Sequence, residues 1–120
     1  MYVLTAANIK DIHDEVIANS GGSPGVLIIG TLEHISFECN RRNDVFVKAA
    51  VALHGVVTMH PFFDGNKRTG FITADVILRS QGYETQADEK DIIDFLLQVA
   101  SYRVDVKGVE EWFRKNTVRA

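Results

Sequence analysis

Several features that mark particular protein classes are scarce or missing in this chain of 120 residues. It has a single cysteine, Cys39, so no disulfide can form within the chain, and a reducing compartment is expected. The longest apolar runs, such as Val26 to Ile29, are far too short to cross a bilayer. Residues Met1 to Thr5 lack the basic start and long apolar run of a signal peptide. We therefore expect a cytoplasmic protein without membrane contact.

An excess of positive charge is also missing. Thirteen Lys and Arg residues stand against 16 Asp and Glu residues, which gives a formal net charge of -3. Nucleic-acid-binding proteins rely on a basic face, so we expect no direct nucleic-acid partner, although an acidic chain can still hold a local basic pocket. Hydrophobic residues make up 46% of the chain, as in ordinary globular proteins. This length and composition predict one domain over residues 1–120.

Apolar residues at helical spacing fill most of the chain. Thr5, Thr31, Asp44 and Asp88 are of the types that cap helix starts, and Gly82 is of the type that follows a helix end. The predicted helices cover residues 6–19, 32–40, 45–59, 66–81, 89–102 and 106–115. Segment 45–59 is apolar on most sides, so we expect it at the centre of the fold. The sequence predicts an all-α, compact six-helix domain.

One segment does not follow the helical pattern. After the breakers of residues 20–25, Val26, Leu27, Ile28 and Ile29 form a short, mostly β-branched run that ends at Gly30. Such a run is typical of extended backbone. We therefore expect a short β-like flap or hairpin arm at residues 26–29.

The segment that follows the central helix concentrates reactive side chains. His60 precedes Pro61, which disfavours helix and ends the preceding one. Asp64, Lys67 and Arg68 follow within nine residues of His60, and the next helix begins at about Asn66. Free backbone N–H groups at a helix start, together with the helix dipole, make a site for anions. The sequence thus predicts a phosphate site at this turn.

The residue types in this turn supply the other parts of a phosphate-transfer site. Histidine can take a proton from a hydroxyl near neutral pH, and an aspartate is a hard oxygen ligand suited to Mg²⁺. Gly65 allows close approach of a phosphate to the backbone, and Asn66 adds an amide donor. Lys67 offers a point charge, Arg68 a two-pronged clamp, and Phe62 can anchor the loop in the core. Together these groups suit transfer of a phosphoryl or nucleotidyl group onto a hydroxyl.

Each of these residues also has an ordinary explanation. His60 alone would more often cap a helix, Asp64 would be a turn residue, and lysines and arginines are usually solvated. A zinc site built from His54, His60 and Asp64 is a further alternative, but His54 and His60 are six residues apart and do not share a helix face. His13 falls on the apolar face of the first helix and is read as a core or boundary histidine.

The segment His60-Pro-Phe-Phe-Asp-Gly-Asn-Lys-Arg68 resembles the active-site motif of the Fic/Doc family, His-x-Phe-x-Asp/Glu-Gly-Asn-x-Arg. The chain length, the helical plan and the Gly-Gly-x-Pro-Gly stretch at residues 21–25 agree with the short Doc ("death on curing") branch of toxin–antitoxin toxins. This resemblance implies that His60 deprotonates a target hydroxyl and that Asp64 holds Mg²⁺. It implies further that residues 65–68 cradle the phosphates of ATP and that residues 26–29 align the target peptide by strand addition.

Three positions bear on which group of ATP is transferred. AMP-transferring Fic proteins usually have a second arginine three residues after the first, but Phe71 stands there. Lys67 stands where many of them carry glycine, whereas Gly65 stands where Doc has alanine. The resemblance therefore favours a Doc-type kinase that transfers the terminal phosphate, with translation elongation factor Tu as the implied target. The alternatives are a Fic-type AMP transferase and a nucleotide- or partner-binding module without turnover.

The resemblance also implies a second protein partner. Family members are inhibited by a helix with a Ser/Thr-x-x-x-Glu-Gly/Asn sequence, in the same chain or in an antitoxin. The nearest match here, Thr85 to Glu89, is followed by Lys90 and falls at a helix start, where the helix dipole explains acidic residues. We therefore expect a separate antitoxin, a segment of which binds this chain as a helix in a groove.

Overall fold

The computed structural model describes residues 2–120 and shows an all-α fold with six helices and a small two-stranded sheet in this range. The chain runs through α1 (Ala6–Ser20), α2 (Ile29–Asn40), α3 (Val45–Met59), α4 (Asn66–Arg79), β1 (Tyr83–Thr85), α5 (Glu89–Ala100), α6 (Val106–Lys115) and β2 (Thr117–Arg119). Met1 of the predicted domain lies outside the described residues.

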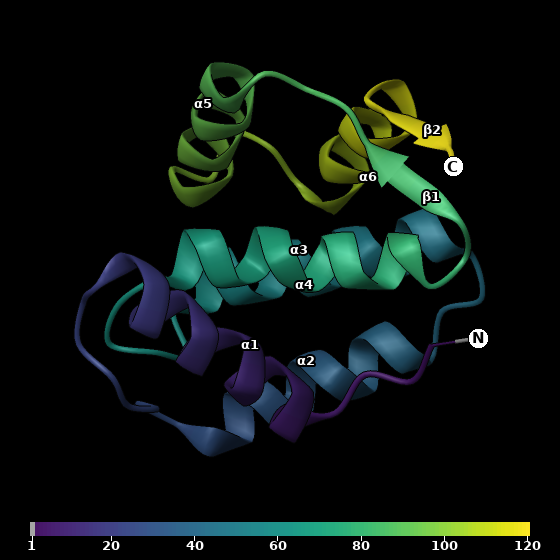
Figure 1. Cartoon of the computed structure of the whole chain (residues 1–120). Coiled ribbons are helices and arrows are strands. Elements are labelled where there is room, and N and C mark those ends of the chain that lie inside the picture. The colour runs from purple at the N-terminus through teal and green to yellow at the C-terminus, as the bar shows by residue number, and fades with distance from the viewer. Residues whose placement is uncertain (1) are drawn as a thin grey trace.

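Helices α3 and α4 form the middle layer of the molecule (Figure 1). Helices α1 and α2 lie on one side of this layer, and α5, α6 and the two strands lie on the other. Gly70 in α4 allows the two central helices to approach closely, because a Cβ atom there would lie 2.9 Å from Val57 and 3.2 Å from the carbonyl oxygen of Leu53. Nine of the residues of α3 are buried, as the apolar sequence predicted.

Local capping chemistry explains why some helix bounds agree with the prediction. Asp44 caps α3 by accepting hydrogen bonds from the backbone N–H groups of Phe46 and Val47, and Thr5 forms a capping box with Asn8 at the start of α1. Helices α3 and α6 have the predicted bounds, while α4 and α5 each end two residues early, at Arg79 and Ala100. Asp88 precedes α5, but its side chain makes no capping hydrogen bond.

The flap prediction was wrong in its extent. Val26 forms a single antiparallel bridge with Phe62, and the N–H of Leu27 donates to the carbonyl of Pro61, but no hairpin forms. Ile29 already belongs to α2, which starts two residues before the predicted cap Thr31 and has no side-chain cap. One bridge is not enough to stabilise a strand. The apolar face of α2, which begins at Leu32, packs in the core and favours helix for the residues just before it.

The strand pair β1–β2 was not predicted. Its register pairs Tyr83 with Arg119 and Thr85 with Thr117, so it joins the end of the chain to the residues that follow α4.

Within residues 2–120, no helix is both long enough and apolar enough to cross a membrane.

Candidate functional site

The turn between α3 and α4 places His60 in a strained and exposed position. His60 is the C-cap of α3 and has a left-handed backbone conformation, with φ 49° and ψ 58°. Residues other than glycine avoid this region because the side chain crowds the backbone. The imidazole is exposed, so it is accessible to a substrate. Strained residues of this kind cluster at functional sites, where the surrounding structure holds them in place.

Phe62 anchors the turn in the core. It is 1% exposed, and its ring stacks on the ring of His13 in α1 at a centroid distance of 3.8 Å. The Nε2 atom of His13 lies 2.8 Å from the carbonyl oxygen of Asp64, so Nε2–H donates to that oxygen. His13 is buried, as predicted, and it also supports the loop from 51 residues away. The only signal for this role in the sequence is a polar residue at a core position.

Asn66 fixes the same turn from the other side. Its Oδ1 accepts a hydrogen bond of 3.1 Å from the backbone N–H of Phe62, and its Nδ2 donates to the carbonyl of Phe62 at 3.0 Å. The side-chain amide is therefore committed to the loop, so a phosphate at this helix start would meet the backbone N–H of Asn66. Gly65, with φ 74°, turns the chain into α4.

The end of α1 and the glycine-rich loop at residues 21–25 contact the acidic and basic groups of the turn. Asp64 accepts hydrogen bonds from the backbone N–H of Ser23 at 3.3 Å and from that of Gly65 at 2.9 Å. Gly22 packs so closely that an added Cβ would lie 2.7 Å from Oδ2 of Asp64. Nη1 of Arg68 donates to the hydroxyl of Ser20 at 2.7 Å. The loop thus contacts the predicted metal ligand, and the end of α1 contacts the predicted clamp.

The start of α4 has an unusual distribution of charge. Its first turn holds Lys67 and Arg68 but no acidic residue. Both side chains are exposed, and among the described residues neither forms a salt bridge. Positive charges at a helix N-terminus repel the dipole, so this arrangement lowers stability unless an anion binds there.

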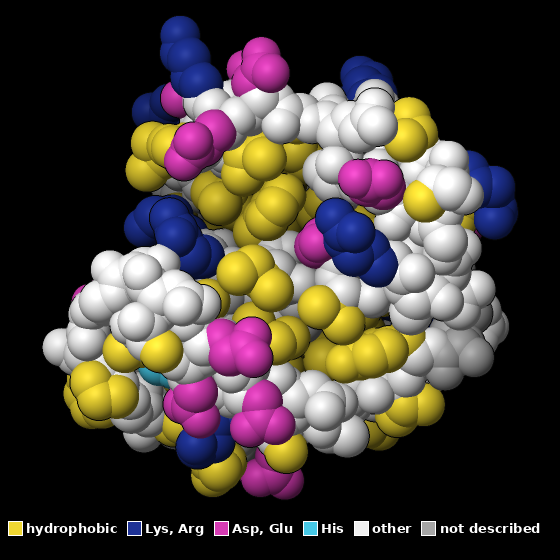
Figure 2. Space-filling model, in the orientation of Figure 1, with side chains coloured by type: hydrophobic (Ala, Val, Ile, Leu, Met, Phe, Trp, Pro, Cys, Tyr) yellow, Lys and Arg dark blue, Asp and Glu magenta, His cyan; other side chains and the backbone are white. Residues whose placement is uncertain are grey.

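A cavity of about 390 Å³ opens beside this helix start. Residues 64–68 form one end of it, and the face of α5 with Ile92, Ile93, Leu96 and Leu97 forms a wall. Figure 2 shows hydrophobic side chains in the hollow between α5 and the central layer, with basic side chains at its left end. Glu89, the last residue of the Thr85–Glu89 match, also lines the cavity, but residues 83–85 form a strand, so the match is not one helix.

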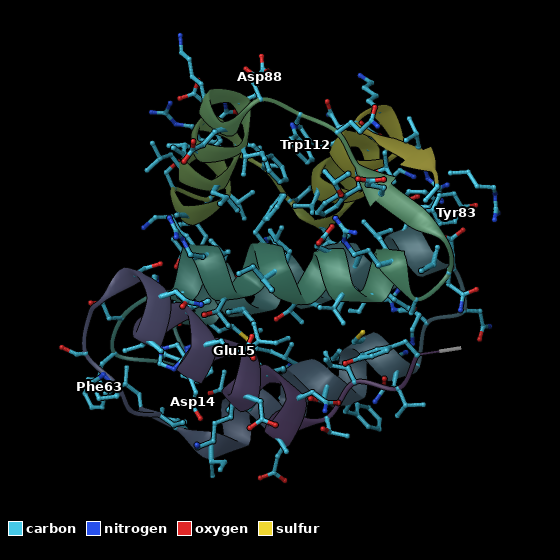
Figure 3. The ribbon with its side chains drawn as sticks, viewed as in Figure 1. Asp14, Glu15, Phe63, Tyr83, Asp88 and Trp112 are labelled. Carbon is cyan, nitrogen blue, oxygen red and sulfur yellow. The ribbon has the colours of Figure 1, made fainter. Side chains whose placement is uncertain are left out.

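Phe71 lies in the cavity wall and joins an aromatic cluster. Its ring centroid is 6.1 Å from that of Phe113 and 6.4 Å from that of Trp112, which stacks on Phe95 at 4.2 Å. Trp112 belongs to α6, and its side chain lies between α6 and α5 (Figure 3). Phe71 thus stands where AMP-transferring proteins usually carry a second arginine, and its ring packs α4 against α5 and α6.

The zinc alternative has no support in residues 2–120, which contain no group of three or more His, Cys, Asp or Glu side chains that could hold a metal ion. Burial lowers the pKa of His54, and the opposing charge of Asp105 only partly compensates. His54 belongs to the buried helix α3, so it is poorly placed to compete with His60 as an exposed base. Magnesium needs fewer protein ligands, because Mg²⁺ often binds through one carboxylate together with substrate phosphates and water, and the carboxylate of Asp64 is exposed.

Comparison with known proteins identifies the family. A model of the Fic/DOC family matches residues 3–78, which include the whole turn and α4 up to its last residue but one. The chain belongs to the Fic/DOC family. The protein kinase Doc of Escherichia phage P1 is 29% identical over 110 residues, covering 87% of this chain and 86% of that protein. A Fido domain-containing protein of Dictyostelium discoideum is 43% identical over 42 residues, covering 35% of this chain and 29% of that protein.

The family match covers only part of the cavity. The first turn of α4 and Phe71 fall inside the matched residues, whereas the wall formed by α5 and the aromatic residues of α6 fall outside them. The Fic/DOC family model therefore includes the proposed phosphate cradle, while the opposite wall of the cavity lies beyond the residues that the model matches.

Proposed function

We propose that this Fic/DOC protein is a Doc-like toxin that transfers the terminal phosphate of ATP to a hydroxyl group of a target protein. The observation that carries the proposal is the helix start with Lys67 and Arg68 and no acidic partner, six residues from an exposed histidine. Such a site gains stability when a phosphate binds, and His60 in the turn before it is the proposed base. Similarity to a protein named as a protein kinase also supports phosphate transfer.

In the proposed reaction His60 accepts the proton of the target hydroxyl. The hydroxyl oxygen forms a bond to the terminal phosphorus, the bond from that phosphorus to its bridging oxygen breaks, and ADP leaves. Arg68 and Lys67 stabilise the negative charge on the phosphate oxygens, together with the backbone N–H groups of residues 66–68, while Gly65 lets the phosphate approach the backbone. Asp64 would hold Mg²⁺, which neutralises phosphate charge when bound.

The packing of Phe71 supports kinase chemistry over AMP transfer. If AMP were transferred, the two outer phosphates would extend along the cavity, where a second cation would be needed. Here that part of the cavity is lined by Phe71, Ile92 and Leu96, which suit an apolar base better than phosphates. The terminal phosphate would then lie at the start of α4, nearest to His60. Replacing Phe71 by arginine is not a clean test, because the change would also disrupt the aromatic cluster.

We also propose that a separate antitoxin inhibits the protein by docking a helix in the groove along α5. Ile93 and Leu97 are 50% and 52% exposed and lie four residues apart, so they form one apolar stripe of the groove wall. An amphipathic helix could cover this stripe and block the nucleotide cavity. The residual flap at Val26, Leu27 and Ile28, where Leu27 and Ile28 are exposed, is proposed to align the target peptide.

The test is incubation with ATP labelled at either the alpha or the gamma phosphate, with translation elongation factor Tu as the first target and a cell extract as the second. We expect label from the gamma position on a protein band, and none with the His60→Ala variant. Label from the alpha position alone would show AMP transfer instead. No label with either ATP, together with toxicity that survives His60→Ala, would favour a binding module without turnover.

A further inference from the structure

Among residues 2–120, only His60 and Tyr102 combine a side chain with a positive φ angle. Tyr102 has φ 63° and follows α5, where its N–H donates to the carbonyl of Val99 and the N–H of Arg103 donates to that of Gln98. These two bonds form the turn that commonly ends a helix, and its left-handed position is usually occupied by glycine. A tyrosine there carries a conformational cost that its local role does not explain.

Burial does not explain the tyrosine either. The side chain is 71% exposed, so little of it contributes to the core. Its hydroxyl instead donates to the carbonyl of Thr58, 44 residues earlier, at 3.3 Å. Thr58 lies in the last turn of α3, two residues before His60. In a continuing helix that carbonyl would accept from the N–H of Phe62, but this N–H donates to Asn66.

We propose that Tyr102 is a positioning residue for His60. It caps a carbonyl at the end of α3 and so fixes the turn that presents the imidazole. The two strained residues are thus linked: one carries the base, and the other supports the helix end from which the base projects. Tyr102 lies outside residues 3–78, which the family model matches. The inference deepens the proposed function and rests on it for its effect on the reaction.

The first test compares Tyr102→Phe with Tyr83→Phe, its matched control. Tyr83 also uses its hydroxyl, which accepts from Nη2 of Arg119 at 2.9 Å, but it lies in β1 at the other end of α4. Because one long hydrogen bond is lost, we expect Tyr102→Phe to lower kcat about threefold to tenfold and to leave the KM for ATP unchanged. Tyr83→Phe should leave both constants unchanged. Equal kcat values for Tyr102→Phe and the unsubstituted chain would overturn the proposal.

The second test separates positioning from a merely structural role. Tyr102→Gly relieves the left-handed strain, so we expect the melting temperature to rise by about 2–5 °C while kcat falls at least as far as in Tyr102→Phe. A lower melting temperature would show that Tyr102 supports the fold as a whole, and the proposal would be wrong.

A third measurement does not depend on activity. In the NMR spectrum of the full chain, Tyr102→Phe should move the imidazole signals of His60, and Tyr83→Phe should not. If the unsubstituted chain transfers nothing, the proposed function fails, but a shifted His60 signal still supports the positioning role. Unmoved His60 signals would refute it in either case.

Discussion

The two ends of α4 have opposite designs. At its C-terminal end Arg79 pairs with Asp75 at 2.8 Å, and Gly82, with φ 82°, takes the left-handed position that ends the turn. A cation near a helix C-terminus and a glycine after it both favour stability. At the N-terminal end, the first turn holds two cations, which oppose the helix dipole, and no acidic residue. In Figure 3, Tyr83 of β1 lies at the right, where α4 ends, and Phe63 of the preceding turn lies at the lower left.

This difference shows which end is shaped for function. A helix optimised for stability would carry Asp or Glu in its first turn, and natural proteins depart from this rule where a ligand supplies the missing charge. The strained His60 makes the same point for the end of α3, because a glycine would fit that conformation at less cost. We therefore expect substitutions at the two ends of α4 to separate activity from stability.

The largest expected effect is on transfer by His60→Ala, compared with Gly82→Ala at the opposite end. Loss of a general base lowers the rate by about 10²–10⁴-fold, so His60→Ala should abolish detectable labelling while circular dichroism shows an intact fold. Gly82→Ala should keep the rate and lose about 1 kcal/mol of stability, because alanine is strained at φ 82°. Full labelling by His60→Ala would contradict the assignment of the base.

The next effect compares Arg68→Lys with Arg79→Lys. Lysine keeps the charge but loses the planar, two-pronged donation, so we expect Arg68→Lys to weaken ATP binding about tenfold or more by calorimetry. Arg79→Lys changes only an exposed ion pair and should leave ATP binding unchanged. Equal ATP affinities for the two variants would remove Arg68 from the phosphate site.

A smaller effect tests the loop that covers the site, through Gly22→Ala and its control Gly30→Ala. Gly22 has φ 115° and lies against the carboxylate of Asp64, so an alanine must displace one of them. We expect severalfold weaker binding of ATP with Mg²⁺ and a lower melting temperature. A Cβ atom at Gly30 would meet nothing within 4 Å, and in α2 alanine should add up to about 1 kcal/mol of stability. Unchanged binding in Gly22→Ala would show that the loop does not orient Asp64.

The smallest effect concerns a cation far from any proposed ligand. Lys48 is 2% exposed, and its Nζ donates to the carbonyl of Cys39 at 3.2 Å. That carbonyl also accepts from the N–H of Arg42, so it keeps a partner when the lysine is removed. Burying the ammonium costs more solvation free energy than one hydrogen bond to a carbonyl restores. Lys48→Met should therefore raise the unfolding free energy by about 1 kcal/mol in urea titrations, without changing ATP binding. A clear loss of stability would show that the ammonium is better solvated than its burial indicates.

Sequence alone predicted the features that depend on near neighbours. The bounds of α3 follow from the Asp44 cap and the His60-Pro61 stop. The burial of Phe62 was also predicted, although its neighbour Phe63 is exposed. What sequence missed depends on distant partners. The β1–β2 pairing joins residues 32 to 36 positions apart, from Thr85 with Thr117 to Tyr83 with Arg119, and needs the whole C-terminal region in place.

The site shows the same division. His60 lies in the turn before α4, and residues 64–68 line one end of the cavity. Their chemical roles remain predictions. Two contacts come from α1: the stack of His13 on Phe62 and the hydrogen bond between Ser20 and Arg68. No local sequence pattern predicts either contact. Likewise, the sequence showed that Phe71 stands in place of an arginine. Only the structure shows that its ring packs against Phe113 of α6.

The most direct measurement of the central claim is an NMR titration of backbone amide signals with ATP and Mg²⁺. If the start of α4 holds the phosphates, the largest shifts will fall on residues 64–69, with little change at residues 79–85 at the other end of the helix. Shifts centred on that other end, or none at saturating nucleotide, would contradict the account.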